Sequence, residues 1–189
     1  MDWLSLIIYL LLVIFGIINI YSTTLSEVTV SLFDMNSPAG KQFWIFIFSL
    51  IFLPIILFIN SHFFEHLSLI FYILSILSLL GLFFFGQKIS GATSWYFIGG
   101  FSIQPSEFAK ITTSLLVAST LSSIQADIKK ISFVTKLLLI IGLPMILVIF
   151  QPDAGTALVF LGLFFVLLRE GMDMKTLYFG MGFISLFIL

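Results

Sequence analysis

Apolar residues occur in long runs that short polar segments separate. A helix that crosses the hydrocarbon core of a bilayer needs about 20 such residues, with a range of roughly 17–25. We therefore expect an all-α polytopic membrane protein with about six complete transmembrane helices. The runs that predict them lie near residues 3–22, 43–60, 67–86, 105–122 and 133–150, with a shorter one at 154–168.

A seventh apolar run begins near Thr176 and continues to Leu189, the last residue. At 1.5 Å per residue it reaches only about 21 Å, which is too short to cross a bilayer. At the other end, Asp2 stands where a signal peptide has basic residues, and the first run lacks a small-residue cleavage site. We expect the first helix to be retained and residues 1–189 to form a single transmembrane domain. We also expect the sequence to be a truncated piece of a longer protein, ending within the seventh helix.

The composition agrees with a membrane protein and excludes several other classes. The chain is 60% hydrophobic and 9% charged, whereas soluble domains are about 25% charged. A net charge of −1 offers no basic patch for nucleic acid. Cysteine is absent and there are two histidines, so disulfides, thiolate chemistry and a multi-histidine metal site are not expected. The residues identify no cofactor and leave a requirement for a divalent cation open.

The basic residues predict the orientation, because cytoplasmic loops carry an excess of Lys and Arg. With the N-terminus in the cytoplasm, Lys41 and Lys88 lie outside and a larger group lies inside. The inside group comprises Lys129, Lys130, Lys136, Arg169 and Lys175. We therefore expect a cytoplasmic N-terminus.

This orientation defines the expected loops. Residues 23–42 are predicted to form an irregular external loop that includes Pro38 and Gly40. In the second external loop, residues 87–104, Gly99 and Gly100 are expected to form the turn of a small hairpin. His62, Glu65 and His66 are predicted to lie in a cytoplasmic loop, as a solvated turn rather than a metal site.

The segment Gln104-Pro105-Ser106-Glu107-Phe108-Ala109-Lys110 has the features of a helix start. Pro105 suits the first helical position, and Glu107 lies in the first turn, where a carboxylate is favoured. Lys110 follows Glu107 by three residues, so their side chains can form a pair. Spacing alone favours a purely structural role, as a helix start with an ion pair. An ionisable group near the hydrocarbon also suggests a functional site.

The segment Gln151-Pro152-Asp153-Ala154-Gly155-Thr156-Ala157 interrupts the apolar run of residues 133–168. Pro152 is expected to end the fifth helix, and Asp153 can cap the sixth. A capping role and a functional role for Asp153 both stay open. The helices that begin at Pro105 and Ala154 run inward from the same face. We therefore hypothesise that Lys110 bridges Glu107 and Asp153 in an outward-facing polar pocket.

Together with Gly91-Ala92-Thr93-Ser94-Trp95, these two segments resemble motifs of the RodA, FtsW and SpoVE family, and RodA most. The resemblance implies a ten-helix protein of the bacterial cytoplasmic membrane that acts in cell elongation, shape and division. Such proteins are peptidoglycan glycosyltransferases, which polymerise lipid II outside the membrane beside a class B penicillin-binding protein.

The resemblance also implies residue roles. Glu107, Lys110 and Asp153 would organise the substrate cavity. The family's catalytic aspartate follows the seventh helix, so no catalytic residue is expected here and the fragment is expected to be inactive alone. Ser94 stands where the family often has arginine, so no phosphate contact is expected there. The residues expected to support the cavity are Gln104, Pro105, Ser106, Gln151, Pro152, Gly155 and Trp95.

Two other functions remain open at this point. A helix broken at an acidic residue also suits a lipid II flippase or transporter. A third interpretation is a non-catalytic scaffold of the cell-wall synthesis complex.

Overall fold

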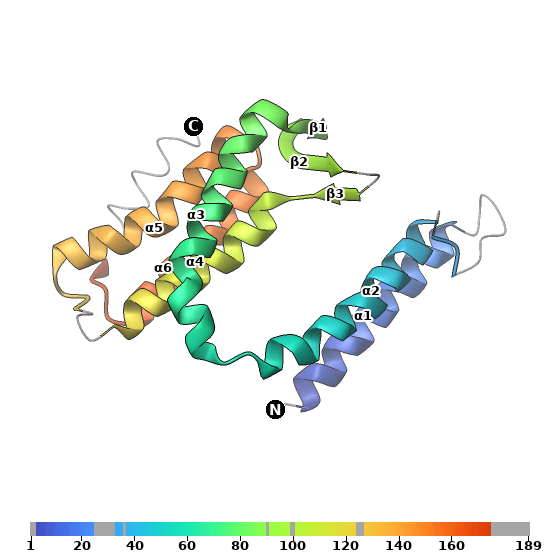
Figure 1. The fold of residues 1–189 in the computed structure, drawn as a ribbon, viewed down its shortest axis with the longest axis horizontal. Coiled ribbons are helices and arrows are strands. Elements are labelled where there is room, and N and C mark those ends of the chain that lie inside the picture. Colours follow the sequence, from blue (N-terminus) through green and yellow to red (C-terminus); the bar gives the residue numbers. More distant parts are fainter. Residues whose placement is uncertain are drawn as a thin grey trace. The chain divides into compact units, whose positions relative to one another are not determined.

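The computed structural model describes residues 3–24, 33–35, 37–89, 91–98, 101–123 and 127–174. The expected seventh helix, from residue 176, lies outside them. The chain divides into two compact units, Met1–Asn60 and Ser61–Leu189 (Figure 1). The first unit contains α1 (Trp3–Thr24) and α2 (Pro38–Phe58). The second contains α3 (Ser61–Phe85), β1 (Gln87–Ile89), β2 (Ala92–Ile98), β3 (Phe101–Ile103), α4 (Pro105–Ser122), α5 (Ile131–Phe150) and α6 (Ala154–Arg169).

Within the described residues, four helices are long and apolar enough to cross a bilayer, namely α1, α2, α3 and α5. The other two are α4, with 18 residues, and α6, with 16. The expected polytopic helical fold is therefore confirmed. Most side chains of α1 and α2 are apolar and exposed, as helices surrounded by acyl chains require.

The second helix begins earlier than predicted. Residues 38–42 were expected in an irregular loop, but α2 starts at Pro38 and includes Gly40. Ser37 caps it, because its Oγ accepts a hydrogen bond from the Gly40 N–H at 2.9 Å. Gly40 is buried, and a Cβ there would overlap the backbone of Asp34. The loop prediction was wrong here because local capping chemistry extends the helix beyond the apolar run.

The third helix also begins earlier, at Ser61, so the predicted cytoplasmic loop for His62, Glu65 and His66 was wrong. All three lie in the first two turns of α3. His62 Nδ1 lies 3.3 Å from Glu65 Oε2, and His66 Nδ1 lies 2.7 Å from the His62 carbonyl oxygen. Contacts between residues three and four apart stabilise a helix. These contacts stabilise the polar first turns of α3, which precede the apolar run.

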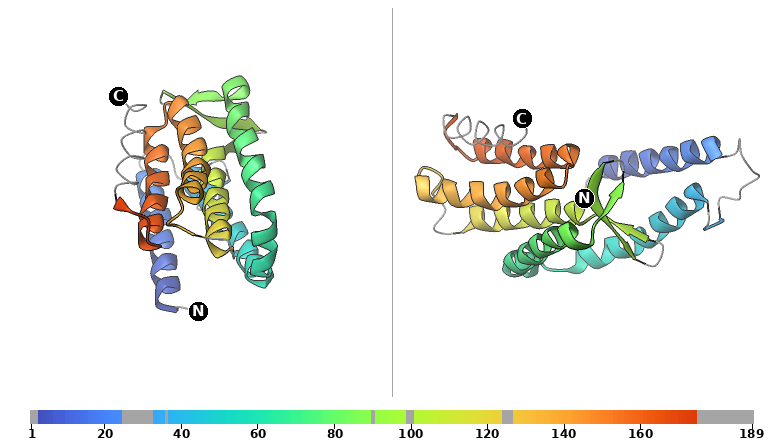
Figure 2. Two further views of the ribbon diagram at one scale, coloured as in Figure 1. Left: turned by 90° about the vertical axis from the view of Figure 1, so that its left-hand side faces the viewer. Right: turned by 90° about the horizontal axis from the view of Figure 1, so that it is seen from above.

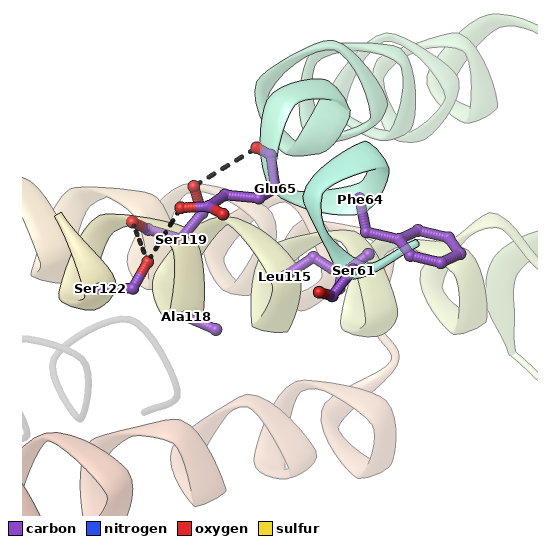
Figure 3. Close-up of a pocket in the computed structure, with 7 residues that line it drawn as sticks. All are labelled: Ser61, Phe64, Glu65, Leu115, Ala118, Ser119 and Ser122. Atoms are coloured by element: carbon purple, nitrogen blue, oxygen red, sulfur yellow. Dashed lines mark hydrogen bonds between the residues drawn. The ribbon is translucent and has the colours of Figure 1, made fainter. Parts of the chain in front are cut away.

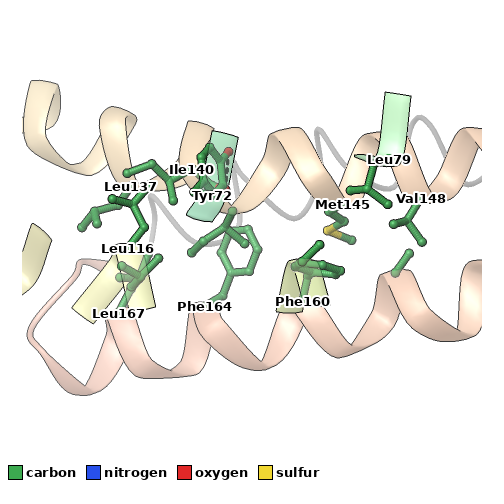
Figure 4. Packing of buried hydrophobic residues seen from close by; sticks show 14 of the residues in the cluster. Tyr72, Leu79, Leu116, Leu137, Ile140, Met145, Val148, Phe160, Phe164 and Leu167 are labelled. Carbon is green, nitrogen blue, oxygen red and sulfur yellow. Dashed lines mark hydrogen bonds between the residues drawn. The ribbon is translucent and has the colours of Figure 1, made fainter. Parts of the chain in front are cut away.

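The core of the second unit lies where α4 contacts α3, α5 and α6 (Figure 2). Figure 4 shows the packing between α5 and α6, with Met145 and Val148 near Phe160. Hydrogen bonds also join the helices, because Tyr72 Oη donates to the Ile140 carbonyl at 3.0 Å. Close packing and interhelical hydrogen bonds are what hold helices together in a bilayer, where apolar burial alone adds little.

A three-stranded antiparallel sheet in the order β1-β2-β3 follows α3. Ile98 pairs with Phe101, which confirms the predicted hairpin, although Gly99 and Gly100 lie outside the described residues. The additional strand β1 was not predicted. Tyr96 Oη donates to the Ser78 carbonyl at 2.8 Å and so fastens β2 to α3. Burial raises the pKa of Tyr96, so the phenol remains a donor to a higher pH than an ordinary tyrosine does.

Candidate functional site

Four helix ends meet beside the sheet: α3 and α5 end there, and α4 and α6 begin there (Figure 1). We call this region the sheet end of the second unit. Glu107 and Lys110 lie in the first two turns of α4, and Asp153 immediately precedes α6. The structure thus places all three ionisable candidates at the same end, as the alternating helix directions predict.

Asp153 joins two of the sequence motifs. Its Oδ1 accepts a hydrogen bond from the Thr156 N–H at 3.1 Å, so the predicted cap of α6 is confirmed. Its Oδ2 accepts a second hydrogen bond from Gln104 Nε2, also at 3.1 Å. The carboxylate is partly buried and is therefore held from two directions. Asp153 both caps a helix and fixes the start of α4 to the start of α6.

Gln104 can reach Asp153 because its side chain has no local role. It occupies the N-cap position of α4, but its side chain makes no capping hydrogen bond there. Pro105 follows at the start of the helix, as predicted, and needs no N–H partner. The Gln104 amide is therefore available to donate across the gap to α6.

Lys110 pairs with Glu107 rather than with Asp153. Its Nζ lies 2.7 Å from Glu107 Oε1, as their spacing predicts. Among the described residues, no hydrogen bond or ion pair links Lys110 to Asp153, whose oxygens bind Gln104 and Thr156. The structure therefore does not support the hypothesised lysine bridge. An uncharged amide takes that place and satisfies the carboxylate without a second buried charge.

The remaining motif residues fall into two groups. Ser106 is fully buried at the start of α4, whereas Pro152 and Gly155 are exposed at the turn between α5 and α6. Trp95 lies on β2 opposite Gln87. In the part of the chain that the structure describes, Trp95 forms no hydrogen bond to Gln104, Lys110 or Asp153. Of the supporting residues, all of which the structure describes, only Gln104 forms a side-chain hydrogen bond to an ionisable candidate.

Gln151 has a larger role than its sequence position suggested. Its side chain is 1% exposed, and its Nε2 donates to the Leu79 carbonyl of α3 at 2.9 Å. Its own carbonyl accepts a hydrogen bond from the Thr93 N–H of β2 at 3.1 Å. One residue thus joins α5, α3 and the sheet. The available sequence signal was a lone amide at the end of an apolar run.

A separate groove lies at the opposite end of α3 and α4 (Figure 3). Its volume is about 310 Å³. Ser122 Oγ donates to Glu65 Oε1 at 3.3 Å across it, and Ser119 Oγ donates to the Glu65 carbonyl at 3.4 Å. None of the three motifs lines this groove, so we assign the candidate site to the sheet end. The lining residues are Ser61, Phe64, Glu65, Leu115, Ala118, Ser119 and Ser122.

In the described ranges, no three His, Asp or Glu side chains gather where they could bind one metal ion. The sheet end instead offers hydrogen-bond donors, the Asp153 carboxylate with its two hydrogen-bond partners, and the Lys110 ammonium paired with Glu107. These groups can bind and orient a polar, partly anionic ligand at a membrane surface.

We expect double-mutant cycles to separate the two polar pairs. Alanine substitutions of Gln104 and Asp153 should show a coupling of about 1.5–3 kcal/mol, as for a hydrogen bond to a charged group. Glu107 and Lys110 should couple by about 0.2–1 kcal/mol, because Glu107 is exposed. The cycle of Lys110 with Asp153 should show almost none. The measurement is the free energy of unfolding in detergent, and a large Lys110–Asp153 coupling would restore the lysine bridge.

The family model FTSW_RODA_SPOVE, described as cell cycle protein, matches residues 2–189. A peptidoglycan glycosyltransferase RodA of Treponema pallidum is 45% identical over 83 residues, which cover 44% of this chain and 19% of the relative. A probable peptidoglycan glycosyltransferase FtsW of Borreliella burgdorferi is 35% identical over 175 residues, which cover 86% of this chain and 45% of the relative. The chain thus spans less than half the length of either.

The same fold occurs in a solved structure described as "Structural coordination of polymerization and crosslinking by a peptidoglycan synthase complex". The match has a TM-score of 0.79 and 25% sequence identity, and it covers 99% of this chain and 53% of the other.

Proposed function

Because the chain belongs to the FtsW, RodA and SpoVE family of cell cycle proteins, we propose that it contributes the first membrane helices of a peptidoglycan glycosyltransferase. The relatives described above carry that activity in their names. The observation that supports the proposal most is the hydrogen bond from Gln104 to Asp153. It unites two distant motifs into one polar site at one end of otherwise apolar helices.

The proposed substrate is lipid II, whose polyprenyl tail stays in the bilayer while its headgroup enters a polar site. The sheet end suits that division, because its polar groups lie where the apolar helices α4 and α6 begin. Lys110 is partly exposed, and its ammonium can pair with the pyrophosphate of the substrate or leaving group. Asp153 has a positioning role in this proposal, because both of its oxygens already hold structural partners.

The proposed location is the bacterial cytoplasmic membrane, with the N-terminus inside and the sheet end outside. The proposed partner is a class B penicillin-binding protein, which cross-links the glycan. The described likeness to a peptidoglycan synthase complex supports this pairing. We further propose an elongation role, as for RodA. A fluorescent fusion along the side wall would support that role, whereas a septal position would support division.

The direct test is to reconstitute the protein, as its gene encodes it, into vesicles with lipid II. Glycan polymer on a gel is the expected result. Lipid II that crosses the bilayer without polymer would favour the flippase function. If neither activity appears while the cross-linking enzyme still binds, the scaffold function takes its place.

A further inference from the structure

Gln151 lies between the end of α5 and the residue that caps α6. Only Pro152 separates it from Asp153. The backbone N–H groups of Gln151 and Asp153 both donate to the Val148 carbonyl, at 3.1 and 3.3 Å, so the turn is closely tied to α5. The position of Gln151 therefore sets where Asp153 can lie.

The rest of the structure fixes Gln151 from two sides. Its side-chain amide donates to the backbone carbonyl of Leu79 on α3, a residue 72 positions earlier in the chain. Carbonyls at the end of a helix lack partners within that helix, and the Gln151 carbonyl finds one in Thr93 of β2. Both contacts are long-range, and the side chain is buried. These contacts attach the turn to α3 and β2 in addition to α5.

We propose that Gln151 is the positioning residue of the sheet end: by hydrogen bonding to α3 and β2, it holds the turn so that Asp153 meets Gln104. The proposal concerns geometry and rests on the proposed function only where activity is the readout. It assigns no contact with substrate to Gln151. A hydrophobic residue of similar size would fill the volume but lose the donor to Leu79.

The unused oxygen of Gln151 makes a sensitive test possible. Oε1 is buried and has no hydrogen-bond partner among the described residues. A neutral glutamic acid at this position keeps a carbonyl there and donates its O–H to Leu79. An ionised one has no donor for Leu79 and leaves a charge in an apolar site, which is costly. The Gln151→Glu variant should therefore hold the turn only while its carboxyl is protonated.

Other charged groups near the turn must be considered. Within the described residues, none is hydrogen-bonded or ion-paired to the Gln151 side chain. The titratable groups on the elements around it are His62, Glu65, His66 and Tyr72 on α3, Lys88 on β1, Tyr96 on β2, Glu107 and Lys110 on α4, Lys136 on α5, and Asp153, Arg169 and Glu170 at the ends of α6. Every pH series therefore needs the unmodified protein as its reference at each pH.

The test uses the protein as its gene encodes it, in lipid nanodiscs, with the variants Gln151→Leu and Gln151→Glu. Gln87→Leu and Gln87→Glu are matched controls, since Gln87 is an exposed glutamine on β1. The first readout is hydrogen exchange of residues 153–157, which does not require catalysis. The second is lipid II polymerisation from about pH 5.5 to pH 9.

We expect Gln151→Leu to exchange at least about fivefold faster than the unmodified protein in the first turn of α6, at every pH, since a loss of 1 kcal/mol has that effect. Gln151→Glu should match the unmodified protein at low pH. Above the pKa of the new carboxyl, its relative activity should fall roughly tenfold per pH unit, because the neutral fraction falls tenfold. The Gln87 variants should change neither readout.

Two results would overturn the proposal. One is a Gln151→Leu variant with unmodified exchange at residues 153–157. The other is a Gln151→Glu variant whose exchange relative to the unmodified protein is the same at every pH. If the Gln151 variants exchange as expected but the unmodified protein makes no polymer, the proposed function fails while the positioning role stands. If the Gln151→Leu variant does not fold, the pH series of Gln151→Glu still tests the proposal.

Discussion

Under the proposed function, replacing Asp153 with alanine is expected to lower lipid II polymerisation about a hundredfold, the cost typical of a displaced active-site geometry. The change removes the acceptor of both the Gln104 amide and the Thr156 N–H. The first turn of α6 loses its cap, which costs about 0.5–2 kcal/mol, and the Gln104 side chain at the start of α4 loses its carboxylate acceptor. The measurement is the initial rate of polymer formation in reconstituted vesicles.

Two comparisons make this result specific. Asp153→Asn keeps a single side-chain oxygen, so it can cap α6 or accept from Gln104 but cannot do both well, and its rate should be intermediate. Asp127→Ala is the matched control, because Asp127 likewise binds a nearby N–H, that of Lys129, at 3.1 Å. It lies at the opposite end of α4 and α5 and should have nearly unmodified activity. Equal losses in Asp127→Ala and Asp153→Ala would contradict a specific role for the sheet end.

Replacing Phe160 with alanine is expected to lower the free energy of unfolding by about 3–5 kcal/mol, the usual cost of deleting a buried aromatic ring. Phe160 is 1% exposed and packs in the cluster between α5 and α6 (Figure 4). Tight packing is a principal attraction between helices in a bilayer, so the cavity left behind weakens the bundle directly. Equilibrium unfolding of the reconstituted protein measures the loss.

The control for Phe160 lies on the same helix. Phe165 is 66% exposed, so Phe165→Ala removes the same ring without opening a cavity. Its free energy of unfolding should change by no more than about 0.5 kcal/mol, as for surface substitutions. A loss at Phe165 as large as that at Phe160 would mean that another part of the protein covers this face of α6.

Local chemistry in the sequence was enough to locate some helix ends. Pro105 and Asp153 mark the starts of α4 and α6 because a proline and a capping aspartate act within one turn of chain. The starts of α2 and α3 were misplaced, since an apolar run shows where a helix crosses hydrocarbon and not how far it extends beyond. Pro38 and His62 lie in those polar extensions.

The composition of the candidate site could be predicted better than its contacts. Alternating helix directions place Lys110 and Asp153 at one end, and opposite charges then favour a pair between them. The structure joins Asp153 to Gln104 instead. Both residues are the N-caps of their helices, whereas Lys110 lies in the second turn of α4 and pairs with Glu107. Nothing near Gln151 in the sequence indicates Leu79, since that contact depends on how α3 and α5 pack.

The long-range contacts of Gln151 also constrain biosynthesis. A ribosome makes the chain from its N-terminus, so α3, the sheet and α4 enter the membrane before residue 151 exists. Until then Thr93 lacks the carbonyl that it binds in the finished fold, and the amide that reaches Leu79 has not been made. Nascent chains arrested before and after this residue should therefore differ in the protease sensitivity of β2. The sheet end of this unit therefore cannot close before α5 is complete.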